Sequence, residues 1–208
     1  MTRLFINYGP TVQVKGVNDD IDFYTAWRSI KTWNKPLIVL VNKFSASSSE
    51  IFAGAIQDYS RGLIIGQNTF GKGSVQGFKK TNFGQIKLTE SLYYRVTGKP
   101  TQILGVKPNL EIPTLLDVNE FGESKYPSAL KPNTISEATF FKKTPLNISK
   151  YKEILAENIK ESSYFKSLFE IKQSRGLKKT RLSLNLSERQ EMNKKEKINS
   201  LKLVNELS

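Results

Sequence analysis

Residues 36–66 read PLIVLVNKFSASSSEIFAGAIQDYSRGLIIG, and this stretch carries the pattern that decides the fold. Residues 37–41 and 63–65 are short continuous apolar runs, which are typical of buried strands. Between them, residues 47–59 place apolar side chains at helical spacing, and Gly62 is expected to end that helix. A strand, a helix and a second strand within about 30 residues predict a βαβ unit, in which a right-handed crossover joins two parallel strands. The predicted fold class is therefore α/β.

Further strands are predicted on both sides of this unit. Upstream, residues 11–14 alternate between apolar and polar side chains as a half-buried strand does. Downstream, turn residues separate short apolar segments, and strands are expected at 74–78, 85–88 and 91–96. Residues 105–113 are expected to be an extended segment that closes the domain.

The whole chain is expected to fall into three segments. These are an α/β core at 1–113, a loop-rich connector at 114–148 and a helical C-terminal region at 149–208. In the last segment, residues 149–174 are amphipathic, whereas 186–207 form a polar helical stretch rich in Lys and Glu. Because only a thin apolar stripe runs along this stretch, the tail from residue 176 is predicted to be a helix without its full packing partner or a mobile end.

The absence of two residue types excludes several classes of enzyme. The chain contains no Cys and no His. A cysteine nucleophile, a Ser-His-Asp triad and a zinc site built from His and Cys are therefore excluded. Any general base must be a Lys, Asp, Glu or Tyr side chain.

The charge of the chain leaves a binding function open. The formal net charge is +13, which would suit nucleic acid or an anionic membrane surface. The excess is spread along the chain without an Arg cluster, so an ordinary solvated surface is the favoured interpretation. The longest apolar run, residues 36–41, is far shorter than the roughly 20 residues needed to cross a bilayer. The first residues lack the layout of a signal peptide, so an address signal is expected to be absent or to lie upstream.

The first candidate site is the segment FSASSSE at residues 44–50. Ser47 followed three residues later by Glu50 matches a capping box, which is the structural interpretation. The functional interpretation starts from the same position. A Ser between a strand and a helix is exposed at the positive end of the helix, and the backbone N–H of Ser48 could face an oxyanion.

The second candidate site is the segment GQNTFGKGSVQ at residues 66–76, which follows a predicted strand. It matches most of a phosphate-binding loop, but Gly73 stands where Ser or Thr should bind magnesium. Residues 74–78 are expected to be extended, whereas such a loop needs a helix N-terminus for its anion. A nucleotide site is therefore disfavoured, and a glycine turn with a solvated Lys72 is the structural alternative.

The two segments together favour an enzyme. Ser47 and Lys72 each follow a strand of the same βαβ unit, and ligand sites in α/β sheets collect at that edge. Lys72 can act as a base for Ser47 only when its amine is neutral, a state that burial without a carboxylate partner favours. The residues that flank Lys72 supply no acid.

With these two segments and others along its length, the chain resembles the C-terminal-processing peptidases. The resemblance covers residues 4–113 well and 114–208 loosely, and the spacing from Ser47 to Lys72 is its most specific part. The matching segments are 4–6, 9–14, 36–41, 44–53, 57–59, 69–73, Gln76, 94–96, 101–102 and 105–108.

The resemblance implies roles for matched residues. Ser47 would be the nucleophile that is acylated, and Lys72 would be its general base and later the proton donor. Gln76 would orient Lys72, and the backbone N–H of Ser48 would be one oxyanion donor. Asp58 matches an acid that is often grouped with the pair.

Asp58 also has a structural interpretation. The helix between Ser47 and Asp58 would separate them by roughly 16 Å, so direct contact is not expected. Asp58 is then predicted to pair with Arg61 or with another surface cation.

The family further implies a crotonase- or ClpP-like core and amide hydrolysis through an acyl-enzyme, without a metal, nucleotide or other cofactor. Residues 1–113 would be the C-terminal part of the catalytic core. The implied partners are protein substrates with apolar C-terminal tails, in the periplasm or at the periplasmic face of the inner membrane as a peripheral protein. An N-terminal region, a PDZ domain and the strand turn with the second oxyanion donor are not found, so a truncated chain is expected.

Two alternatives remain. A catalytically incomplete remnant would keep the fold and act at most as a binding or scaffold module. A basic nucleic-acid-binding protein is the other, and it would show salt-sensitive binding. Its only sequence support is the aromatic and basic run at residues 93–95, which is more simply explained as part of a strand.

Overall fold

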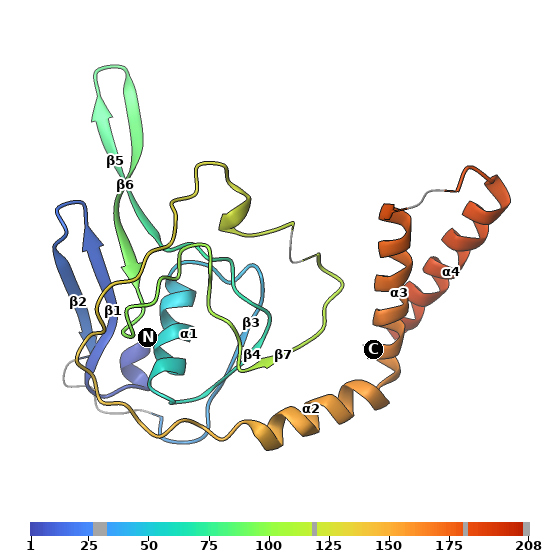
Figure 1. Cartoon of the computed structure of the whole chain (residues 1–208), viewed down its shortest axis with the longest axis horizontal. Helices are drawn as coiled ribbons and strands as arrows, with labels where there is room; N and C mark the ends of the chain where they lie inside the picture. Colours follow the sequence, from blue (N-terminus) through green and yellow to red (C-terminus); the bar gives the residue numbers. More distant parts are fainter. Residues whose placement is uncertain (27–32, 118–119, 181–182, 206–208) are drawn as a thin grey trace. The chain divides into compact units, whose positions relative to one another are not determined.

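The computed structural model describes residues 1–26, 33–117, 120–180 and 183–205. Two compact units make up the chain (Figure 1). The first contains Met1–Ile112 and Val118–Asn147, and the second contains Pro113–Asp117 and Ile148–Ser208. Residues 118–147, most of the predicted connector, therefore belong to the first unit.

A short 3-10 helix, η1 (Thr2–Leu4), begins the first unit, which contains a four-stranded antiparallel sheet in the order β2-β1-β6-β5. The prediction of separate strands at 85–88 and 91–96 is wrong, because one strand, which ends at Tyr94, covers the first segment and residues 91–94 of the second. Thr89, which lies between them, pairs with Gln76 and continues the ladder. The strands of this sheet are β1 (Gly9–Gly16), β2 (Ile21–Ala26), β5 (Ser74–Thr81) and β6 (Gly84–Tyr94).

The second sheet of this unit contains the predicted βαβ motif. Helix α1 (Ser48–Asp58) connects β3 (Ile38–Val41) to the parallel strand β4 (Leu63–Gly66). Strand β7 (Leu110–Glu111), in the segment predicted to close the domain, pairs with β4 in parallel. The α/β class is therefore confirmed.

The end of α1 differs from the prediction. The helix ends at Asp58, and Tyr59 is the C-cap, whose N–H donates to the carbonyl of Ala55. Gly62 has another role, since a Cβ at this position would lie 2.6 Å from the carbonyl oxygen of Leu37. The glycine therefore permits the close approach of the chain to the start of β3.

Strand β3 is not the buried strand that its apolar sequence predicts. Ile38 and Leu40 are 57% and 76% exposed, whereas Val41 is buried. The strand is at the edge of its sheet, and only alternate side chains can face α1. A short apolar run cannot reveal by itself whether both of its faces are covered.

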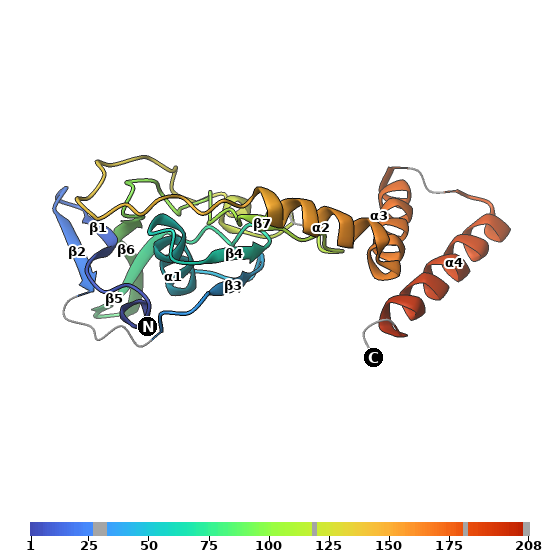
Figure 2. The ribbon, with the colours of Figure 1, turned by 90° about the horizontal axis from the view of Figure 1, so that it is seen from below.

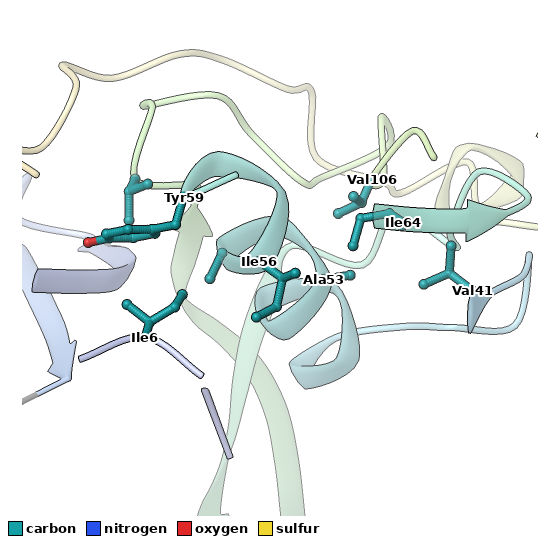
Figure 3. Packing of buried hydrophobic residues seen from close by; sticks show 9 residues of the cluster. Ile6, Val41, Ala53, Ile56, Tyr59, Ile64 and Val106 are labelled. Carbon is teal, nitrogen blue, oxygen red and sulfur yellow. The ribbon is translucent and has the colours of Figure 1, made fainter. Parts of the chain in front are cut away.

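The core of the first unit forms around α1 (Figure 3). Ala53 and Ile56 on α1 pack with Ile64 of β4, and small side chains on the helix allow close contact with the sheet. Strands and loops from distant parts of the sequence complete the cluster. Its other buried members are Ile6, Val41, Ala55, Tyr59, Val96 and Val106.

The irregular segment 120–147 is attached to this core by backbone hydrogen bonds, and its only regular element is η2 (Glu123–Lys125). The N–H of Ala138 donates to the carbonyl of Val96 at 2.9 Å. The buried amide of Gln13 donates to the carbonyl of Ser136 at 3.1 Å. These bonds satisfy polar groups that a sheet or helix would otherwise pair.

The second unit contains α2 (Ser149–Glu161), α3 (Ser163–Thr180) and α4 (Leu186–Asn205). The helix predicted at 149–174 is interrupted at Ser162, which has extended backbone angles. Leu203 of α4 is buried with Leu168 and Ile171 of α3, and Figure 2 shows α4 running obliquely back toward α3. Leu203 is the only buried residue of α4 among the described residues, and Leu201 and Val204 are exposed, so the prediction of a helix without a full packing partner is confirmed. Residues 206–207 of that prediction lie outside the described residues. No helix in the described ranges is long and apolar enough to cross a membrane.

The core assignment predicts a difference between two isoleucines. Ile56 is fully buried in α1, whereas Ile38 is 57% exposed on β3. Ile56→Ala should lower the free energy of unfolding by about 2–5 kcal/mol, because it leaves a cavity beside the sheet. The matched variant Ile38→Ala should change it by about 0.5 kcal/mol or less. Urea unfolding followed by circular dichroism measures both, and equal losses would contradict the assignment.

Candidate active site

Ser47 occupies an unusual backbone conformation at the start of α1. It is the N-cap residue, with φ of 57° and ψ of −120°. A positive φ is uncommon for a residue with a side chain and costs about 1–3 kcal/mol, so surrounding contacts must hold it. The capping box with Glu50 is present, and the Ser47 N–H donates to Glu50 Oε2 at 2.8 Å. Ser47 is half-buried, and Ser48, whose N–H belongs to the first helical turn, is exposed.

Glu50 does more than cap the helix. Its side chain is buried, and Oε1 accepts hydrogen bonds from Thr69 Oγ1 at 2.5 Å and from the Gly71 N–H at 2.7 Å. Its other oxygen, Oε2, accepts the N–H of Lys72 at 3.0 Å in addition to that of Ser47. One carboxylate oxygen therefore binds the backbone of both proposed catalytic residues.

The electrostatic surroundings of Glu50 contain a second buried charge. Burial raises the pKa of Glu50, and the hydrogen bond from Thr69 is the largest effect that opposes this rise. Lys43 is also buried, and its Nζ donates to the carbonyl of Thr69 at 3.1 Å. Burial lowers the pKa of Lys43, while the charge of Glu50 opposes the decrease. The two charges thus stabilise each other in a region that water reaches poorly.

The backbone of the loop that carries Lys72 lies very close to the backbone of another segment. Gly71 has φ of 92°, and a Cβ there would lie 2.7 Å from the carbonyl oxygen of Ile103. Ile103 itself has φ of 64°, which is strained for a β-branched residue, and its N–H donates to the Gly71 carbonyl at 2.7 Å. This contact helps to fix the conformation of the loop beside Lys72.

Lys72 and Gln76 line the same cavity, which has a volume of about 390 Å³. Gln76 lies on β5, and the buried side chain of Gln102 bridges two parts of the wall. Gln102 accepts the Gly73 N–H at 2.8 Å and donates to Glu123 Oε1 at 3.1 Å. The structure therefore brings Gln76 to the cavity of Lys72, as the expected orienting role requires.

Tyr93 is a site residue that sequence reasoning missed. Its N–H donates to the carbonyl of Gly73 at 2.9 Å, and its buried hydroxyl donates to the carbonyl of Lys72. Burial raises the pKa of Tyr93, the charge of Glu50 raises it further, and a hydrogen bond with the Ser47 side chain opposes the rise. The sequence shows Tyr93 only as an alternating strand residue, because its contact with the site depends on sheet register.

The hydroxyl of Ser47 and the amine of Lys72 form no hydrogen bond with each other among the described residues. Their backbones are nevertheless held to one oxygen atom of Glu50. Catalytic hydrogen bonds are often long or absent without a substrate and become shorter when it binds. The carboxylate of Glu50 therefore anchors the backbones of Ser47 and Lys72 close to each other.

Asp58 lies at the opposite end of α1 from Ser47. Its carboxylate forms a two-point ion pair with Arg95 of the segment after β6, at 2.5 Å to Nη2 and 3.1 Å to Nε. Burial raises the pKa of Asp58, and the hydrogen bond and charge of Arg95 oppose that rise. The expected partner Arg61 instead donates to three backbone carbonyl groups. The structure therefore does not bring Asp58 together with Ser47 and Lys72.

No group of three or more acidic side chains in the described ranges is arranged to hold a metal ion.

Comparison with known proteins identifies the family. Residues 1–112 match the family model of peptidase family S41, which is more than half of the chain. The chain belongs to peptidase family S41. This result confirms the resemblance that the segments around Ser47 and Lys72 indicated.

Individual relatives agree with this assignment. The tail-specific protease of Haemophilus influenzae is 37% identical over 222 residues, which cover 99% of this chain and 32% of that protein. The carboxy-terminal-processing protease of Bartonella bacilliformis is 41% identical over 114 residues, which are 54% of this chain and 26% of that protein. The solved photosystem II D1 C-terminal processing protease is 35% identical with a TM-score of 0.50, over 56% of this chain and 31% of that one. The chain therefore spans about a third or less of the length of these relatives.

The hydrogen bonds of Glu50 predict that a nearly isosteric substitution of this residue destabilises the fold. In Glu50→Gln, the new NH₂ group must face at least one of the N–H or O–H donors that the carboxylate now accepts. We expect a loss of about 2–5 kcal/mol in the free energy of unfolding, because buried donors lose their partner. Glu111→Gln on β7, an exposed carboxylate, is the matched control and should change little. Chemical denaturation measures both, and a neutral Glu50→Gln variant would contradict the network.

The Asp58 ion pair gives a second prediction. Asp58→Ala should lower the free energy of unfolding by about 3 kcal/mol, because it removes the carboxylate from a largely buried guanidinium that keeps only Gln57 as a side-chain partner. Glu137→Ala removes one member of the more exposed pair with Lys142 and should cost at most about 1 kcal/mol. A double-mutant cycle with Arg95→Ala should show strong coupling to Asp58. Independent effects of the two substitutions would mean that the pair does not stabilise the fold.

Proposed function

We propose that this chain carries the catalytic pair of a serine-type endopeptidase, with Ser47 as the nucleophile and Lys72 as the general base. The observation that carries the proposal is the single Glu50 oxygen that holds the backbones of both residues. Membership of peptidase family S41 supports the reaction class. The absence of Cys and His from the sequence leaves Lys72 as the natural base at this edge of the sheet.

The proposed reaction proceeds through an acyl-enzyme. The neutral amine of Lys72 takes the proton of the Ser47 hydroxyl as the oxygen attacks the carbonyl carbon of the scissile bond. The N–H of Ser48 donates to the oxyanion that develops. The Lys72 ammonium then protonates the leaving amine, and a water molecule, activated by Lys72, hydrolyses the ester. Gln76 orients the Lys72 amine from β5, and Asp58 supports the fold through Arg95 rather than taking part in the chemistry.

We propose polypeptides with apolar, unstructured C-terminal tails as substrates, and no cofactor. The names of the relatives, a tail-specific and a carboxy-terminal-processing protease, support this substrate class. We also place the protein in the periplasm or, as a peripheral protein, at the periplasmic face of the inner membrane. Fractionation of the native host with an antibody against this chain would test the location, and recovery in the cytoplasmic fraction would overturn it.

A non-catalytic remnant is the second candidate. The observation that favours it is that Ser47 is not among the residues that line the cavity of Lys72, and no hydrogen bond joins the two side chains among the described residues. Such a remnant would fold cooperatively and bind polypeptides without cleaving them.

The proposed mechanism predicts the effect of two substitutions. Ser47→Ala and Lys72→Ala should each lower the hydrolysis of an unfolded reporter with an apolar C-terminus by roughly 10⁴-fold or more, because each removes an essential part of the acyl transfer. Ser49→Ala removes an exposed hydroxyl from the same helical turn and should retain activity. Cleavage that survives Ser47→Ala would overturn the assignment. A folded but inactive wild-type chain would favour the remnant.

A further inference from the structure

The hairpin formed by β5 and β6 carries an unusual surface next to the candidate active site. Figure 1 shows its distal part extending away from α1 and from the rest of the first unit. Phe78 is 67% exposed on this part, and Phe83 at the turn is fully exposed. Exposed aromatic side chains that cluster on one element indicate an interaction surface.

One face of the hairpin is continuous with the cavity that Lys72 lines. Phe78 lies opposite Lys87 in the register, and Gln76 lies opposite Thr89. Opposite residues of an antiparallel pair share a face, so these four side chains lie on the same side. Gln76, Lys87 and Thr89 line the cavity that also contains Lys72. Phe78 extends this face beyond the cavity, and Lys87 Nζ lies 5.6 Å from the centre of its ring.

The edge of the hairpin can accept an extended polypeptide. In the order β2-β1-β6-β5, strand β5 has a neighbour on only one side among the described strands. An edge strand presents backbone N–H and C=O groups to which a peptide can add as a further strand. Alternate side chains of that peptide would then lie on the face that carries Phe78 and Lys87.

The positive charge of the hairpin indicates that the bound peptide carries acidic side chains. Residues 78–88 contain Lys79, Lys80 and Lys87 and no acidic residue. Glu90 covers Gly77, where a Cβ would lie 2.4 Å from its carboxylate, and this is the face opposite to Lys87. The cavity contains one carboxylate, Glu123, and it accepts a hydrogen bond from Gln102. The face beside Phe78 is therefore cationic.

We propose that Phe78 and Lys87 form a substrate subsite for an acidic residue two positions from an apolar one in an extended polypeptide, so that both side chains lie on the same face. The inference rests on the proposed function, because it extends the same site along β5. Phe78 is six positions after Lys72, so the subsite lies up to about 20 Å along the strand from the catalytic base. It contacts the substrate about six residues from the scissile bond.

Peptide binding to the Ser47→Ala chain tests this subsite without hydrolysis. Three fluorescein-labelled peptides share an apolar C-terminus, and their middle segments place Glu, Gln or Lys two positions from Phe. The Glu peptide should bind about three- to tenfold more tightly than the Lys peptide. Adding Lys87→Gln should remove this preference, and adding Phe78→Ser should weaken the binding of all three peptides roughly tenfold.

A substitution on the opposite face provides the control. Lys79 pairs with Ile86, so Lys79→Gln changes the net charge as Lys87→Gln does but leaves the proposed face intact. The inference is overturned if the two variants behave alike, if no peptide is preferred or if no peptide binds. Hydrolysis by the Ser47 chain is measured separately. If the peptides bind selectively but the unaltered chain does not hydrolyse them, only the proposed reaction is contradicted. If the unaltered chain hydrolyses them but Lys87→Gln has no effect on binding, only this inference is contradicted.

Discussion

The carboxylate of Glu50 is the interaction on which the geometry of the candidate site depends. A buried charge is costly unless its oxygens are hydrogen-bonded, and this one accepts one hydroxyl and three backbone N–H groups. Two of these donors belong to Ser47 and Lys72, which follow different strands. The network therefore compensates for the strained φ of Ser47 and positions the Lys72 loop with the same side chain.

Strand β6 and helix α1 hold in place the segments that the Glu50 carboxylate connects. At one end of α1, Glu50 binds the Lys72 loop, and at the other end Asp58 pairs with Arg95, which follows β6. Tyr93, near the end of β6, donates its hydroxyl to the carbonyl of Lys72. Both ends of the helix are thus connected to the segments that position the proposed base.

The cavity beside Lys72 is assembled from segments that are distant in the sequence. Its walls come from the β5–β6 hairpin, from the segment around Gln102 and from residues 123–130. Gln102 fastens these parts together, because its amide bonds to both Gly73 and Glu123. The irregular segment after residue 120 therefore contributes directly to the shape of the candidate site, although it has almost no regular secondary structure.

The sequence by itself determined the βαβ unit, because apolar periodicity and strand length are local properties of residues 36–66. It also determined that Ser47 and Lys72 would meet at one edge, since the carboxyl ends of parallel strands lie together. The tertiary structure alone decided the second role of Glu50, the contact of Tyr93, the partner of Asp58 and the exposed face of β3. These features depend on strand register and on contacts between residues 20 to 40 positions apart, which no local pattern specifies.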